Sequence, residues 1–169
     1  MRKGIAAFLL VVFCLEASVF AKVDAKKAAY VGGTVTVYKD AKEPVKGRLE
    51  VKGEDALKFL SEDKKLKQDY TIPYKDVIDL EYGQKAGRRV GAAIATAVLL
   101  SPVGLFLLFS KKRKHYLTVG YKDAEGKEQA AIFELGKDTV RETLAVVQAR
   151  SGKEVQYQDE EAKKSSKGN

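Results

Sequence analysis

Residues 115–135, HYLTVGYKDAEGKEQAAIFEL, decide the class of the fold, because their pattern predicts a β-hairpin. Before the turn, Leu117, Val119 and Tyr121 recur at every second position, and a period of two is typical of a half-buried strand. The turn DAEG ends in Gly126, which takes the left-handed backbone conformation without a steric penalty. The segment after the turn alternates again, so the sequence predicts two antiparallel strands here.

Shorter segments with the same period precede the hairpin. They are residues 30–38, 47–53, 56–60 and 70–82, separated by turn-forming or charged residues and preceded by a charged lead-in at 22–28. Gly32 and Gly33 predict a β-bulge or a close approach of two backbones, and Pro73 either lies on an edge or divides its segment. The chain is therefore expected to begin with a meander of short antiparallel strands.

One amphipathic helix is predicted after the hairpin, at residues 137–150. Thr139 and Glu142 have the spacing of a capping box, and Gly152 is a good C-terminal stop. The apolar positions that share one helical face are Val140, Leu144 and Val147. We expect this face to cover the open end of the sheet.

The two ends of the chain carry different predictions. Residues 1–21 predict a secretory signal peptide, with a basic start, an apolar core and a small-residue cleavage site. An uncleaved N-terminal anchor is the alternative, although the apolar core is shorter than the ~17 residues that span a bilayer. Cys14 lies inside this signal, so the mature chain has no disulfide, and its composition favours an exported, periplasmic bacterial protein. Residues 153–169 are polar and are predicted to form a disordered tail.

An apolar stretch without a charged residue, VGAAIATAVLLSPVGLFLLF at residues 90–109, interrupts the strand pattern. As one helix it would be about 30 Å long, which is the thickness of the hydrocarbon core of a bilayer. Ser101 and Pro102 predict a kink or a break in that helix. The prediction is therefore a helical insert at residues 84–114, bent near its middle.

The residues of the insert divide into three groups. The side chains predicted to enter a membrane leaflet are Val90, Ile94, Val98, Leu99, Leu100, Val103, Leu105, Phe106, Leu107, Leu108 and Phe109. A collar of cations predicted to contact anionic headgroups consists of Lys85, Arg88, Arg89, Lys111, Lys112, Arg113 and Lys114. Small residues recurring every four positions, where the second arm or a second copy of the protein would pack, are Gly87, Gly91 and Ala95.

The local concentration of charge bears on the class of partner. The whole chain has a formal net charge of +8, and the collar cations are crowded around the apolar stretch. Nucleic-acid-binding proteins usually spread a basic face over their fold, so no nucleic acid is expected as a partner. The alternative is that the collar only keeps the ends of a buried helix in solution.

The order of elements resembles the pleckstrin-homology-like superfold, in the broad sense that includes GRAM and bacterial PH domains. The resemblance covers residues 29–152 and is carried by IPYKDVIDLEYG at 72–83, by the 115–135 hairpin and by DTVRETLAVVQAR at 138–150. It implies a mainly β (α+β) domain at residues 22–152, a small bent antiparallel sheet or barrel capped by a C-terminal helix. Such domains normally have a short loop where this chain has the insert. The first hairpin has no phosphoinositide motif, so no headgroup specificity is implied.

This fold constrains how the insert meets a membrane. If the strands before and after it share one sheet, both of its ends lie on the same side of the bilayer, which excludes a single crossing. The stretch is too short to cross twice, so a re-entrant hairpin in one leaflet remains. The sequence therefore predicts an exported membrane-associated binding module for anionic lipids, with a protein partner or a second copy as further candidates.

Two other interpretations stay open. In the first, the protein is a soluble periplasmic scaffold or assembly protein whose insert is buried or mediates oligomers. The segment LFLLF at residues 105–109 is apolar all round, which suits lipid better than one packed face. In the second, the insert spans as a single helix, which would separate the strands into two incomplete sheets with exposed edges.

The sequence points away from an enzyme. The single histidine, His115, is interpreted as a surface residue without a partner, and Asp79 and Glu81 as ordinary solvent-exposed charges. We find no cluster with metal-ligand spacing and no glycine loop that would hold a phosphate. No catalytic residue, metal or cofactor is therefore expected.

Overall fold

The computed structural model describes residues 26–35, 37–38, 41, 43–66, 68–84 and 114–167. The strands are β1 (Lys26–Gly33), β2 (Val45–Glu50), β3 (Ala56–Ser61), β4 (Tyr70–Pro73), β5 (Val77–Gly83), β6 (His115–Lys122), β7 (Glu128–Leu135) and β8 (Val155–Tyr157). The helices are η1 (Tyr74–Asp76), η2 (Lys137–Thr139), α4 (Val140–Ser151) and α5 (Glu160–Ser166).

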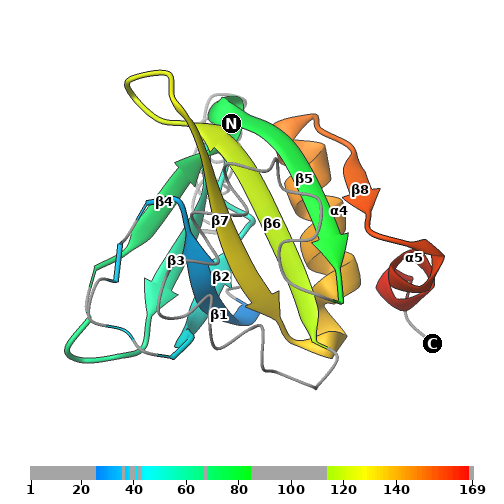
Figure 1. Ribbon diagram of the computed structural model, residues 1–169, viewed down its shortest axis with the longest axis horizontal. Helices are drawn as coiled ribbons and strands as arrows, with labels where there is room; N and C mark the ends of the chain where they lie inside the picture. The colour runs from blue at the N-terminus through cyan, green and yellow to red at the C-terminus, as the bar shows by residue number, and fades with distance from the viewer. Residues whose placement is uncertain are drawn as a thin grey trace, which may run out of the picture.

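All eight strands belong to one strongly bent sheet, in the order β4-β3-β2-β1-β7-β6-β5-β8. Every pairing is antiparallel except that of β8 with β5, which is parallel. Figure 1 shows α4 behind β5 and β6, on the inner side of the bend. The predicted mainly β, α+β class is therefore confirmed.

The predicted hairpin of β6 and β7 is present with the expected turn. Tyr121 pairs with Gln129, and the chain reverses through Gly126, whose φ is 76°. The Asp123 carboxylate accepts hydrogen bonds from the backbone N–H groups of Glu125 and Lys127, at 3.1 and 2.8 Å. This turn fixes the register in which β6 and β7 pair.

Aromatic side chains fill the inside of the bend. The ring centroids of Tyr30, Phe59 and Phe133 lie 5.8 to 6.2 Å from one another, and the three side chains are at most 5% exposed. These residues come from β1, β3 and β7, and β1 pairs with both β2 and β7. One core therefore connects the part of the sheet formed by β1 to β4 with the part that contains β7.

The first strand lies earlier in the chain than its pattern predicted. β1 starts at Lys26, inside the predicted lead-in, and ends at Gly33 rather than at Tyr38. Its early residues form a ladder because Ala28 has partners on both sides, Gly47 and Leu135. The predicted bulge is confirmed, since the register shifts between Tyr30 and Gly32. Likewise Pro73 divides its segment, with η1 between β4 and β5.

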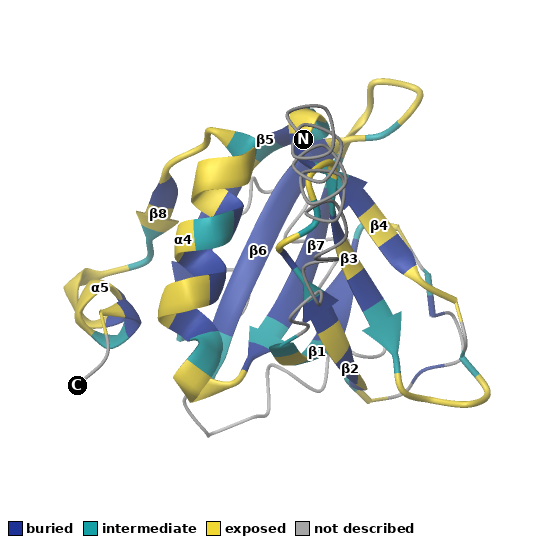
Figure 2. Cartoon of the chain, turned by 180° about the vertical axis from the view of Figure 1, so that it is seen from behind, coloured by how far each residue is buried: buried dark blue, intermediate teal, exposed yellow. Residues whose placement is uncertain are grey.

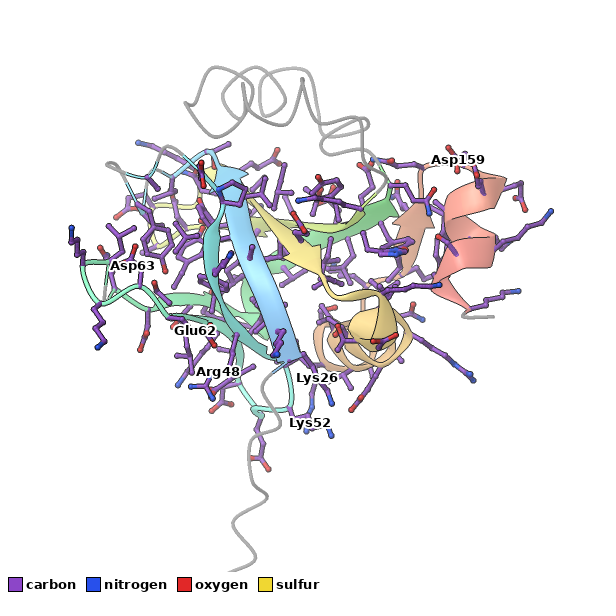
Figure 3. The ribbon with its side chains drawn as sticks, turned by 90° about the horizontal axis from the view of Figure 1, so that it is seen from below. Lys26, Arg48, Lys52, Glu62, Asp63 and Asp159 are labelled. Atoms are coloured by element: carbon purple, nitrogen blue, oxygen red, sulfur yellow. The ribbon has the colours of Figure 1, made fainter. Side chains whose placement is uncertain are left out.

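The predicted helix is present as η2 and α4, and its apolar face is turned toward the sheet (Figure 2). Gly152 ends α4 with a φ of 67°, as predicted. The predicted capping box is wrong, because the Thr139 hydroxyl donates to the Gly136 carbonyl instead. Glu142 lies 3.0 Å from Lys52 Nζ and 3.1 Å from Lys26 Nζ, and hydrogen bonds from these two lysines lower its pKa. Figure 3 shows Lys26 and Lys52 near each other at the start of β1.

The prediction of a disordered tail is wrong for most of residues 153–167. In β8, Val155 pairs with Leu80 and Tyr157 with Tyr82. The Asp159 side chain caps α5 by accepting a hydrogen bond from the Ala162 N–H at 2.8 Å. A three-residue strand is too short to show a period, and α5 buries only small side chains, so neither element has an apolar pattern.

Two predicted segments lie outside the described residues, namely the signal peptide at 1–21 and the insert between Gln84 and Lys114. In the part of the chain that the structure describes, no helix is long and apolar enough to cross a membrane.

Candidate functional site

The two ends of the predicted insert leave the sheet from neighbouring strands. β5 ends at Gly83 and β6 begins at His115, and in this antiparallel pair Gly83 lies opposite Tyr116. Gln84 and Lys114 therefore emerge at the same end of the sheet, where the tip of β5 lies beside the start of β6 (Figure 1). We call Gly83, Gln84, Lys114 and His115 the insert base.

Of the residues predicted to contact or enter a membrane, Lys114 is the one that the structure describes. Its Nζ lies 2.8 Å from Glu134 Oε2, and the two side chains are 29% and 24% exposed. A pair this close to solvent contributes at most about 1 kcal/mol to stability. The other collar cations, the apolar side chains from Val90 to Phe109 and the small residues Gly87, Gly91 and Ala95 lie outside the described residues.

The interpretation of His115 as a surface residue without a partner is wrong. Its Nδ1 lies 2.5 Å from the Tyr82 hydroxyl, and the two rings are stacked with centroids 6.1 Å apart. The Tyr82 hydroxyl also lies 3.2 Å from Ser165 Oγ in α5. Burial, with the charge of Lys137 as a second cause, lowers the pKa of His115 and favours the neutral imidazole. Tyr82 therefore connects the insert base to α5.

Glu81 also departs from its prediction. Its side chain is only 6% exposed, and its Oε1 accepts a hydrogen bond from Gln158 Nε2 at 2.9 Å. The Gln158 side chain lies against Gly83, where a Cβ atom would come within 1.8 Å of it. Gly83 leaves room for the Gln158 side chain, and the hydrogen bond from Gln158 to Glu81 attaches the segment after β8 to β5. Asp79 is exposed, as predicted, but its carboxyl accepts a hydrogen bond from the Gly120 backbone, and partial burial raises its pKa.

The polar side chains at and beside the insert base connect neighbouring elements of the fold to one another. Ser165 Oγ donates to the Ala162 carbonyl at 2.8 Å, and the imidazole contacts a tyrosine rather than the serine. This differs from the serine–histidine contact that activates a nucleophile. Within the described ranges, no three His, Cys, Asp or Glu side chains are grouped so that they could hold a metal ion. Tyr82, His115 and Ser165 thus hold β5, β6 and α5 together.

These neighbours could not be recognised from the sequence. Tyr82, His115 and Ser165 are far apart in the chain, and each is unremarkable in its own segment. The one useful signal in the sequence was the predicted pairing of the strands before and after the insert. That pairing places the residue after β5 beside the residue before β6.

Comparison with known proteins adds no family to this description. No protein-family model matches the chain, and no curated protein matches it. The geometry of the insert base therefore carries the functional proposal.

Proposed function

We propose that this protein is an exported, membrane-associated binding module that the insert anchors in one leaflet, with the collar cations on anionic headgroups. One observation carries the proposal, namely that β5 and β6 are adjacent antiparallel strands with Gly83 opposite Tyr116. Because the insert joins these two strands, both of its ends lie at one end of one sheet. An apolar segment held in this way enters and leaves a membrane on the same side.

The composition of the insert supports lipid as the partner. Burial of apolar surface contributes ~25 cal/mol per Å², so large side chains such as Leu105 and Phe106 would supply most of the affinity. Each nearby Lys or Arg adds ~1 kcal/mol on an anionic surface. The matching basic flanks would hold both ends of the insert in one headgroup layer, as a hairpin in a single leaflet requires.

We also propose that the domain has the pleckstrin-homology-like fold. The proposal is supported by seven antiparallel strands in a strongly bent sheet, followed by a helix on its inner side. β8 and α5 come after this helix and would be additions to the fold. No ligand specificity follows from the resemblance.

One observation favours the alternative of a soluble scaffold whose insert is buried. On the side of β6 and β7 that faces away from α4, Tyr116, Thr118 and Ile132 are 4%, 5% and 0% exposed. Figure 1 shows no labelled helix in front of these strands. This largely apolar face of β6 and β7 would suit a packed apolar segment of the insert, and it would also suit a partner protein.

Extraction of membranes from cells that express the full chain tests the proposal and separates it from the alternative. We expect the protein to stay in the membrane pellet through both a high-salt wash and a carbonate wash at pH 11, because apolar burial resists both. Release by carbonate or by salt would show that the insert does not enter the bilayer. Recovery in the soluble fraction before any wash would support the scaffold.

A further inference from the structure

A groove of about 380 Å³ lies beside the insert base, on the outer side of β1. It runs between the start of β2 and the end of β7, and Lys114 belongs both to its lining and to the insert base. Its size is within the range of small-ligand sites. The floor is formed by the backbone of β1 at Ala28 and Ala29 and by the small side chain of Ala29.

The strand pairing places charged side chains along the two walls of this groove. Ala29 lies opposite Lys46 in β2 and opposite Glu134 in β7, so these two side chains flank the floor on one face of the sheet. The Glu134 carboxylate is engaged by Lys114 at 2.8 Å. Glu43 is the second acid of the lining, and it is exposed at the rim.

Two further cations line the groove, and their charges are not neutralised by an ion pair with any described residue. Lys27 and Lys46 are exposed, and no described residue forms an ion pair with either of them. Lysine binds phosphate oxygens as a mobile point charge on a flexible stem. With Lys114, three lysines therefore converge on a groove that opens next to the segment proposed to enter the membrane.

We propose that this groove binds the phosphate of an anionic lipid headgroup in the leaflet that holds the insert, with Lys27 and Lys46 as its contacts. The proposal rests on the membrane anchoring argued above, because the insert base is what would bring the groove to the headgroup layer. Charge complementarity and the shared residue Lys114 favour a lipid phosphate over a soluble phosphate compound. The groove would strengthen the preference for anionic lipid that the collar cations already give the anchor.

A pair of double variants with the same change in charge tests the groove. K27Q/K46Q removes the two available cations, and K122Q/K127Q removes two exposed lysines at the turn between β6 and β7, at the far end of the sheet. Binding of the purified protein is measured by flotation with vesicles of phosphatidylcholine alone or with phosphatidylglycerol added. We expect K27Q/K46Q to weaken binding to the phosphatidylglycerol vesicles roughly 30-fold, and the control variant to weaken it less than about threefold.

The same assay separates failure of the groove from failure of the anchor. On phosphatidylcholine vesicles both variants are expected to bind as the parent protein does, because the insert is unchanged. Equal losses in the two double variants, or no loss in either, would overturn the groove. The groove would also be overturned if the parent protein bound vesicles made anionic by a fatty acid as tightly as phosphatidylglycerol vesicles. Release of the parent protein from phosphatidylglycerol vesicles by millimolar glycerol 3-phosphate would overturn it as well. Failure of the parent protein to bind any vesicle would instead overturn the anchor on which the groove depends.

Discussion

Replacing residues 85–114 by an Asn-Gly turn is expected to abolish membrane association and to leave the sheet folded. Gln84 would then lie opposite His115, which continues the register in which Gly83 lies opposite Tyr116. Asn-Gly is the preferred two-residue connection for such a pair. Even four Leu or Phe side chains contribute about 6 kcal/mol when buried in lipid, so affinity for vesicles should fall roughly ten-thousand-fold.

The control for this variant keeps the apolar stretch and replaces the collar cations by glutamine. We expect this control to lose part of its preference for anionic vesicles, because Lys27 and Lys46 are unchanged, and to keep its affinity for phosphatidylcholine vesicles. Flotation measures the binding of both variants, and circular dichroism with urea unfolding reports whether the sheet is intact. Vesicle binding by the shortened chain would show that the anchor lies elsewhere. Unfolding of the shortened chain would show that the described domain needs the insert for its stability.

Substitution of Phe133 by alanine is expected to lower the free energy of unfolding by about 3 to 5 kcal/mol. The side chain is fully buried, with ring centroids 5.9 Å from Tyr30 and 5.8 Å from Phe59. Truncation leaves a cavity at the point where β7 meets the core of the first four strands. Urea unfolding, followed by circular dichroism, measures the change.

Val35 provides a matched control for that measurement. It is the exposed large apolar residue of the described chain, at 36%, and V35A should change the free energy of unfolding by less than about 0.5 kcal/mol. A loss below about 1 kcal/mol in F133A would contradict a single core shared by the two parts of the sheet. Two separate unfolding transitions would contradict it as well.

Much of the sheet was predictable because its strands carry a local period. Leu117, Val119 and Tyr121 alternate along β6, and the turn at Gly126 fixes the register of the hairpin. Pro73 was expected either on an edge or at a division of its segment, and the structure shows the division. The local period failed at Lys26, because the first residues of β1 are held by ladders to β2 and β7 rather than by any apolar alternation of their own.

The end of the chain shows why other elements were missed. Tyr157 pairs with Tyr82, and Ser165 meets the Tyr82 hydroxyl, so both are ordered by a strand that is distant in sequence. His115 and Glu81 were misjudged for the same reason, since their partners come from other elements. Charge and polarity describe a residue in isolation, whereas burial depends on what the fold brings beside it.

One part of the candidate site could be predicted from the sequence, and the other part could not. That the insert begins and ends at one place followed from the predicted sheet, and the pairing of Gly83 with Tyr116 confirms the meeting of its two ends. The groove did not follow from the sequence, because Lys27, Lys46 and Glu134 are brought together only by the register of three strands.

The measurement that tests the central claim most directly is labelling of single cysteines from one side of the membrane. Asp63→Cys and Glu125→Cys place exposed thiols before and after the apolar stretch, in a chain whose native Cys14 is changed to serine. Both thiols are predicted to react with a membrane-impermeant maleimide from the same side of intact membranes, and neither only after permeabilisation. Labelling of one thiol in intact membranes and of the other only after permeabilisation would show that the stretch crosses the bilayer once, in contradiction to a single sheet at one surface.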